Sequence, residues 1–285
     1  MTNPPVSTTP APSPAPSPAP GTNRSLRIAL LSVGSALVAG LLVTGSVQFA
    51  AASTGEDESG RYLVEQAFTA LDIDVSAAAV TVRYDDVPEA VLDFSAGQKA
   101  LRFEHEVRGD TLEVRVVNRG WWVFGLISGP FSGLDSPRLD VVLPKSLAPV
   151  ALDVQSSAGD VDASGTFAAT DLETSAGNID VAGSAESLRL STSAGNIDGA
   201  DLEVDGDVST HTSAGNADLS FETLPAGLRM QGSAGNITAE LPAGEYEIDA
   251  STSFGTVDRG VPSTPGADRH YSFATDAGDI HLRAR

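Results

Sequence analysis

Apolar and polar residues alternate along most of the chain after residue 67, and a short glycine motif interrupts the alternation at regular intervals. From residue 151 onward the motif occurs seven times, with 18 to 23 residues between successive copies. Seven copies at near-constant spacing indicate a repeat architecture in which neighbouring units share one core. In chain order the copies read SSAGDVD, TSAGNID, TSAGNID, TSAGNAD, GSAGNIT, TSFGTVD and TDAGDIH.

Each repeat has the period-two pattern of a strand with one buried face. In the third copy the residues seven, five, three and one before the glycine are apolar or small: Leu188, Leu190, Thr192 and Ala194. The apolar phase resumes two residues after the glycine, so the pattern predicts a bend or bulge at the motif. Glycine supplies the backbone freedom for such a bend, including positive φ. The predicted corners are Gly159, Gly177, Gly195, Gly215, Gly235, Gly255 and Gly278.

One repeat of strand, corner, short strand and loop is too small to bury its apolar face alone. We therefore predict an all-β fold, a β-solenoid or β-helix-like stack of 18–20-residue repeats with equivalent corners about 4.8 Å apart. An antiparallel β-sandwich is the alternative, because it also allows two turns per repeat. Regular repeats occupy 151–285, and an irregular part of the same domain occupies 67–150, where Ala78 stands in the place of a corner glycine.

The first 66 residues follow a different pattern. Residues 1–27 are rich in Pro, Ala and Ser and predict a disordered, polyproline-like tail. Residues 28–52 hold no charge, and as a helix their first 22 residues would run ~33 Å, enough to span a bilayer. Residues 53–66 are then a linker to the extracytoplasmic β-repeat domain, residues 67–285.

The charges that flank this apolar segment predict its orientation. Arg24 and Arg27 precede the segment, whereas Glu56, Asp57 and Glu58 follow it, so the positive-inside rule places the N-terminus in the cytoplasm. The competing interpretation is a cleavable signal peptide, because three alanines at 50–52 fit a small-residue cleavage site. A retained helix predicts a single-pass protein of the cell membrane with its C-terminal domain outside.

Small residues line one face of the predicted membrane helix at steps of four positions. Such faces let two helices approach closely, which raises the hypothesis of a homo-oligomer formed through the membrane. The residues are Ser32, Ala36, Gly40 and Thr44.

Charge and composition exclude several classes of function. The net charge is −21, and after residue 50 the chain has 15 basic against 38 acidic side chains, so nucleic acid is not an expected partner. The absence of cysteine excludes disulfides and thiol catalysis. The four histidines show no metal-ligand spacing, and nucleotide-binding and serine-nucleophile motifs are absent from the sequence, so we expect no enzyme and no cofactor.

One outward position of the repeat is repeatedly acidic. The third residue after the corner glycine is aspartate in the first four copies, and stacked copies would place these carboxylates about 4.8 Å apart. Carboxylate oxygens are ligands that Ca²⁺ prefers, although the spacing matches neither an EF-hand nor the nonapeptide calcium repeat. We expect weak Ca²⁺ binding or screening here, with the candidate metal ligands Asp162, Asp180, Asp198 and Asp218.

The run WWVFGLISGPF is the only aromatic-rich apolar segment of the domain and contains both tryptophans. Such a run either caps one end of the stack or forms an exposed docking or membrane-touching loop. The candidate partner patch is Trp121, Trp122 and Phe124.

The membrane anchor, the segment RLDVVLPK and the serial SAGNID-type repeats together resemble the bacterial putative-adhesin family, a domain of unknown function in membrane-anchored β-strand-repeat proteins. The resemblance covers residues 65–285 and implies a non-enzymatic, adhesin-like envelope protein. The anchor, the outward topology and the extended repeat indicate a binding role, with cell-wall polymer or another envelope protein as the expected partner. Two alternatives stay open: an envelope-stress sensor or regulator that signals through the cytoplasmic tail, and a carbohydrate-active β-helix enzyme.

Overall fold

The computed structural model describes residues 59–97, 101–118 and 136–285. Within them the elements are nineteen strands and one 3-10 turn, η1 (Lys145–Leu147), which confirms the all-β prediction. Residues 55–285 form one compact unit. The predicted tail 1–27 and membrane helix 28–52 lie outside the described residues, and no helix in the described part is long and apolar enough to cross a membrane.

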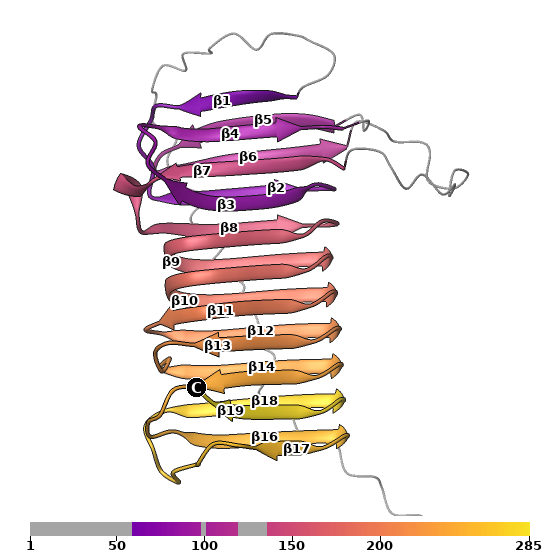
Figure 1. Cartoon of the computed structure of the whole chain (residues 1–285). Helices are drawn as coiled ribbons and strands as arrows, with labels where there is room; N and C mark the ends of the chain where they lie inside the picture. The colour runs from indigo at the N-terminus through magenta and orange to yellow at the C-terminus, as the bar shows by residue number, and fades with distance from the viewer. Residues whose placement is uncertain (1–58, 98–100, 119–135) are drawn as a thin grey trace, which may run out of the picture. The chain divides into compact units, whose positions relative to one another are not determined.

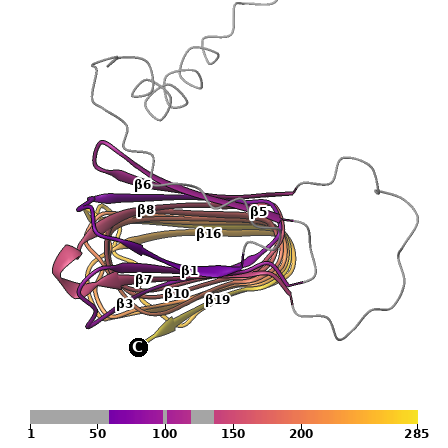
Figure 2. The ribbon, with the colours of Figure 1, turned by 90° about the horizontal axis from the view of Figure 1, so that it is seen from above.

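The strands form two facing layers, which Figure 2 shows edge-on from above. In order of pairing, the first layer contains β5 (Leu101–Arg108), β6 (Thr111–Asn118), β2 (Ala70–Val75), β8 (Val150–Ser156), the second halves of β9 (Val161–Ala176) and β10 (Ile179–Ala194), then β12 (Asp207–Ala214), β14 (Gly227–Ala234), β18 (His270–Ala277) and β16 (Glu247–Phe254).

The second layer runs alongside in the same manner. It contains β1 (Gly60–Val64), β4 (Ala90–Ser95), β7 (Arg138–Pro144), β3 (Ala79–Asp85), the first halves of β9 and β10, then β11 (Ile197–Val204), β13 (Ala217–Phe221), β15 (Ile237–Leu241), β19 (Ile280–Ala284) and β17 (Val257–Arg259). Each repeat thus contributes one strand to each layer, and the glycine corner joins the two.

Successive repeats pair in parallel and in register. Ile179 pairs with Ile197, and Leu188 pairs with Val208, which are equivalent positions of neighbouring copies. Antiparallel pairing occurs among the described residues only near the N-terminal end, in β1–β4, β4–β7 and β5–β6. The regular repeats are therefore coils of a parallel stack, visible as rungs in Figure 1, and not an antiparallel sandwich.

The predicted inward positions form the core, with one correction. Leu188, Leu190 and Thr192 are each at most 2% exposed, and Ile197 is fully buried. Ala194, which the alternation also placed inward, is exposed. Ala194 still pairs with Ala214, but Ser193 and Ala194 are both exposed, so the alternation of inward and outward side chains ends just before the corner glycine.

The corner glycines are required by conformation and by space. All seven adopt φ between +139° and +155°, a region that side chains with a Cβ rarely occupy. A Cβ on Gly195 would lie 1.9 Å from the carbonyl oxygen of Gly177 in the next coil. The predicted corners are thus confirmed. Ala78 stacks on Gly159 at the equivalent place of the neighbouring coil, since a Cβ on Gly159 would lie 2.2 Å from the carbonyl oxygen of Ala78.

Buried threonines bind the coils to each other at the corners. Three residues before its glycine, Thr192 donates a hydrogen bond of 3.1 Å to the Gly177 carbonyl, and Thr275 donates one of 3.1 Å to the Gly235 carbonyl. The hydroxyl therefore satisfies its own hydrogen-bonding requirement inside the core and ties one coil to the next. Equivalent bonds are made by the buried Thr174 and Thr212 and by the half-buried Thr252.

The order of coils departs from the order of the sequence at both ends. The last coil, β18 and β19, lies between β14 and β15 on one side and β16 and β17 on the other, so the sixth repeat is outermost (Figure 1). At the other end β2 pairs with both β6 and β8, and β3 with both β7 and β9. Near each end, therefore, one coil is inserted between two others that precede or follow it in a different sequence order.

The segment 53–66, expected to be a linker, contains strand β1 from Gly60 to Val64. This strand pairs antiparallel with β4 and belongs to the domain. The sequence conceals it because it is only five residues long, and Leu63 within it is 61% exposed where an inward apolar position would be expected.

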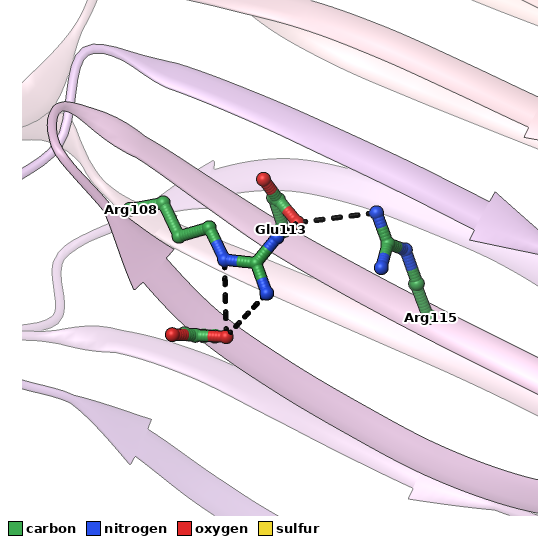
Figure 3. A network of polar contacts seen from close by, with 4 residues as sticks. Arg108, Glu113 and Arg115 are labelled. Carbon is green, nitrogen blue, oxygen red and sulfur yellow. Dashed lines mark hydrogen bonds and ion pairs between the residues drawn. The ribbon is translucent and has the colours of Figure 1, made fainter. Parts of the chain in front are cut away.

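The N-terminal end is closed by a β-hairpin and by aromatic rings. β5 and β6 pair antiparallel across Gly109, and Arg108, Glu113 and Arg115 form an ion-pair network on the hairpin, with Glu106 as its fourth member (Figure 3). A stack of rings joins β1, β4 and β5, with centroid distances of 4.8 to 5.5 Å among Tyr62, Phe94, Phe103 and His105.

Candidate functional site

The four predicted aspartates form a continuous row on the outward face of the second layer. Asp162 pairs with Asp180, Asp180 with Asp198, and Asp198 with Asp218, so each lies one strand from the next on β9, β10, β11 and β13. The row then continues to Thr238 and His281. Asp258 is separated from the four by these two residues, because the last coil is inserted before the sixth.

A groove of about 490 Å³ runs beside this row. Small side chains two positions further along each strand form the other part of its lining, at Ser164, Ala182, Ala200 and Ser220, and Glu240 lies at its end. The groove is open above these short side chains, because the longer aspartate side chains stand along one side of it only. The groove therefore crosses five neighbouring strands, from β9 to β15.

The row is electrostatically unfavourable in its ionised form. Partial burial, followed by the charge of neighbouring carboxylates, raises the pKa of each aspartate above the ordinary value of 3.8. For Asp180 the most important neighbour is Asp198, while for Asp218 it is Glu240, and Arg283 acts in the opposite direction. Three of the four are exposed, so water and salt screen much of the repulsion.

The raised pKa values determine how the row affects stability at different pH. Unfolding returns each carboxyl to its ordinary pKa, so the folded state gains most below about pH 3.8. This contribution is lost as the pH rises through the raised folded-state values. At neutral pH the row therefore opposes folding.

Cations of the chain itself lie at the rim and not within the row. The Arg285 guanidinium donates to Asp201 at 2.7 Å and also to Glu222, just beyond the groove. None of the four aspartates has an ion-pair partner in the described part of the chain. In that same part, no group of three or more His, Asp or Glu side chains is placed to hold a metal ion.

The residues next to the corner glycines form a hydrogen-bonded ladder. The side-chain oxygen of each residue accepts the backbone N–H of the equivalent residue in the neighbouring coil, as from Asn216 to Asn196 at 2.9 Å. The ladder stabilises the corner and leaves the aspartate charges uncompensated. Its other members are Asp160, Asn178, Asn236 and Asp279.

The remaining predicted site lies outside the described residues, since Trp121, Trp122 and Phe124 belong to 119–135. Sequence reasoning did not find Glu240 or the small residues of the groove. The signal that could have found them is the recurrence of serine or alanine two residues after each aspartate, at Ser164, Ala182, Ala200 and Ser220.

Comparison with known proteins identifies the repeat region. The family model described as Toastrack DUF4097 matches residues 152–283, which include all the aspartates of the row. No curated protein matches the chain.

Three solved structures are similar to the chain at 12% identity. They are a putative cell adhesion protein from Clostridium sporogenes (80% of this chain and 100% of that chain covered, TM-score 0.37), a putative adhesin from Bacteroides fragilis (79% and 95%, TM-score 0.45) and a putative adhesin from Parabacteroides distasonis (80% and 98%, TM-score 0.34). These likenesses are too distant to identify a ligand or a partner.

Proposed function

Because residues 152–283 of this chain belong to the Toastrack DUF4097 family, we propose that the chain is an adhesin-like binding protein of the cell envelope that catalyses no reaction. The apolar segment 28–52 anchors it in the membrane, with the N-terminus in the cytoplasm and the β-repeat domain outside. Its ligand is a cell-wall polymer or another envelope protein.

The observation that carries this proposal is the groove across five strands of the second layer. A groove that follows neighbouring strands of one sheet is elongated and suits an extended ligand, such as a polymer or a peptide segment. The threonine and asparagine ladders fix the spacing of the strands beneath it. The ligand would therefore meet a preformed surface and would not have to order it, which lowers the cost of binding.

A pull-down tests the binding role. Residues 55–285, which form one compact unit with their own core, are immobilised and offered cell-wall fractions and solubilised envelope proteins. We expect a wall polymer or an envelope protein to be retained. Retention of neither above background would refute the proposal.

A matched pair of variants tests the groove. Three aspartates of the row are changed to asparagine, and the control makes the same change of charge on the first layer. We expect the groove variant to lose most of the retained ligand and the control to keep it. Equal retention by both variants would exclude the groove as the binding surface. The groove variant changes Asp180, Asp198 and Asp218, and the control changes Asp153, Asp249 and Asp276.

The proposed topology is tested separately by protease access to the full chain in intact cells stripped of their wall. An extracytoplasmic domain is cleaved without lysis, and the fragment that remains membrane-bound contains residues 28–52. Protection of the domain until lysis would overturn the topology without affecting the binding result.

A further inference from the structure

The outermost coil has unpaired edges in both layers. Among the described residues β16 pairs only with β18, and β17 pairs only with β19. Along a strand, alternate residues direct their backbone groups to opposite edges. In β16 the N–H of Glu247 donates inward to the neighbouring coil, so by alternation Thr252 directs its N–H and C=O groups outward. In the same way the N–H of Gly260 donates inward, so Val257 of β17 directs its backbone groups outward.

Other parts of the chain occupy half of this edge. The Ser263 hydroxyl accepts the outward N–H of Ile248 at 2.9 Å, and the Arg259 guanidinium donates to the outward carbonyl of Ala250 at 3.2 Å. These contacts cover one outward N–H and one outward carbonyl in the first half of β16. The half next to the corner, from Thr252 through Phe254 and onward into β17, has no strand on its outward side in the part of the chain that the structure describes. This segment is called the open corner below.

Phe254 marks the open corner. Phe254 is 80% exposed and is the most exposed large apolar residue in the described part of the chain. The six other copies of the repeat have alanine at the position before the corner glycine: Ala158, Ala176, Ala194, Ala214, Ala234 and Ala277. The large apolar side chain therefore occurs only in the coil that the fold places outermost, although that coil is sixth in the sequence.

We propose that the open corner is a dimer interface and that its occupant is the open corner of a second copy of this chain. A single extended peptide would pair with the edge of one layer and leave the other edge open. A second copy presents two edges with the same separation, because it is the same coil. The contact is two-fold symmetric and closed, and it covers Phe254 of both copies.

The opposite end of the stack does not offer the same fit. There the layers end in β1 and β5, and the rings of Tyr62 and Phe103, 4.8 Å apart between centroids, join them. Stacking of that end on the open corner would also be a head-to-tail contact, which continues into filaments instead of closing.

Cysteine crosslinking of the full chain tests the proposal, because the protein contains no cysteine of its own. Ser253 at the open corner and Ser193 in the middle of the stack occupy equivalent exposed positions two residues before their glycines. Each is changed singly to cysteine and treated with a short bifunctional maleimide in intact cells. We expect at least fivefold more covalent dimer from Ser253→Cys than from Ser193→Cys.

A second substitution separates this interface from association elsewhere in the chain. Phe254→Ala restores the residue of the other six copies and is therefore compatible with the fold. Added to Ser253→Cys, it should lower the dimer yield severalfold, because each copy loses a buried ring at the interface. Leu63→Ala, an exposed apolar residue at the opposite end, should leave the yield unchanged.

Three outcomes would overturn the proposal. They are equal crosslinking at Ser253→Cys and Ser193→Cys, a yield that Phe254→Ala does not change, and crosslinking of Ser253→Cys to a different protein instead of a second copy. Loss of the groove ligand in the pull-down would not affect any of these results, so the two proposals can fail independently.

Discussion

Replacing one corner glycine by alanine tests whether the repeat motif is dictated by the close stacking of corners. We choose Gly195, in the middle of the regular coils, where φ is +152°. Its added Cβ would lie 1.9 Å from the Gly177 carbonyl oxygen and 2.6 Å from the carbonyl carbon. Both contacts are with backbone, so no flexible side chain can move aside.

Two costs add to the expected effect. Holding alanine in this glycine-only region of φ costs about 1–3 kcal/mol. Forcing the coils apart to admit a methyl group costs about 1–3 kcal/mol more, the usual penalty of overpacking. We expect Gly195→Ala to lower the free energy of unfolding by about 4 kcal/mol, a large share of the ~5–15 kcal/mol available to a domain.

Gly109 provides the control. It also has positive φ, +66°, but no atom lies within 4 Å of the position of an added Cβ. Gly109→Ala should therefore cost only about 1 kcal/mol, because it has the conformational penalty without the collision. Thermal unfolding of residues 55–285, followed by circular dichroism, measures both. At ~2–4 °C per kcal/mol, the melting temperature should fall by about 8–16 °C for Gly195→Ala and by about 2–4 °C for Gly109→Ala.

The explanation of the motif would be refuted if the two variants melted within about 2 °C of each other, which corresponds to less than about 1 kcal/mol. Hydrogen exchange adds a local test. If the coils separate as expected, amides that cross the corner near Gly195 lose protection first, among them the N–H of Gly195 that donates to the Ala214 carbonyl.

Three further predictions concern the ladder, the row and the inserted coil. Asn196→Ala removes the acceptor of the 2.9 Å bond from the Asn216 amide and should cost about 1 kcal/mol of unfolding free energy in a denaturant titration, whereas no change would mean that the ladder is energetically neutral. The variant in which Asp180, Asp198 and Asp218 are changed to asparagine should have a higher melting temperature than the wild type at pH 7, because only ionised carboxylates repel. Near pH 3 its melting temperature should be no higher than that of the wild type, and a difference that does not depend on pH would contradict the raised pKa values. Deleting residues 270–285 removes four buried apolar side chains, whose burial is worth about 6–12 kcal/mol, and leaves β16 and β17 without a neighbouring coil. Limited proteolysis should therefore cleave residues 245–269 readily, and resistance of this segment would contradict the inserted order of the coils.

The period of the sequence determined the secondary structure and most of the core. Alternation identified Leu188, Leu190 and Ile197 as inward, and all three are buried. The motif identified the corners because only glycine fits a positive φ against a neighbouring backbone. Even Ala78 was predictable, since the spacing of apolar residues around it matches that of the repeats. These features are local, and each repeat specifies them by its own residues.

The order of the coils was decided only by the tertiary structure. All seven repeats present nearly the same inward pattern, so any of them could stack on any other, and the sequence does not determine which coil is outermost. The fold places the sixth repeat there and inserts the seventh between the fifth and the sixth. This order separates Asp258 from the acidic row and places Phe254, at a position that is exposed in every coil, in the outermost coil. The sequence thus determined what each coil contains, whereas the pairing of distant strands, which depends on contacts between coils and not within them, decided where its residues meet.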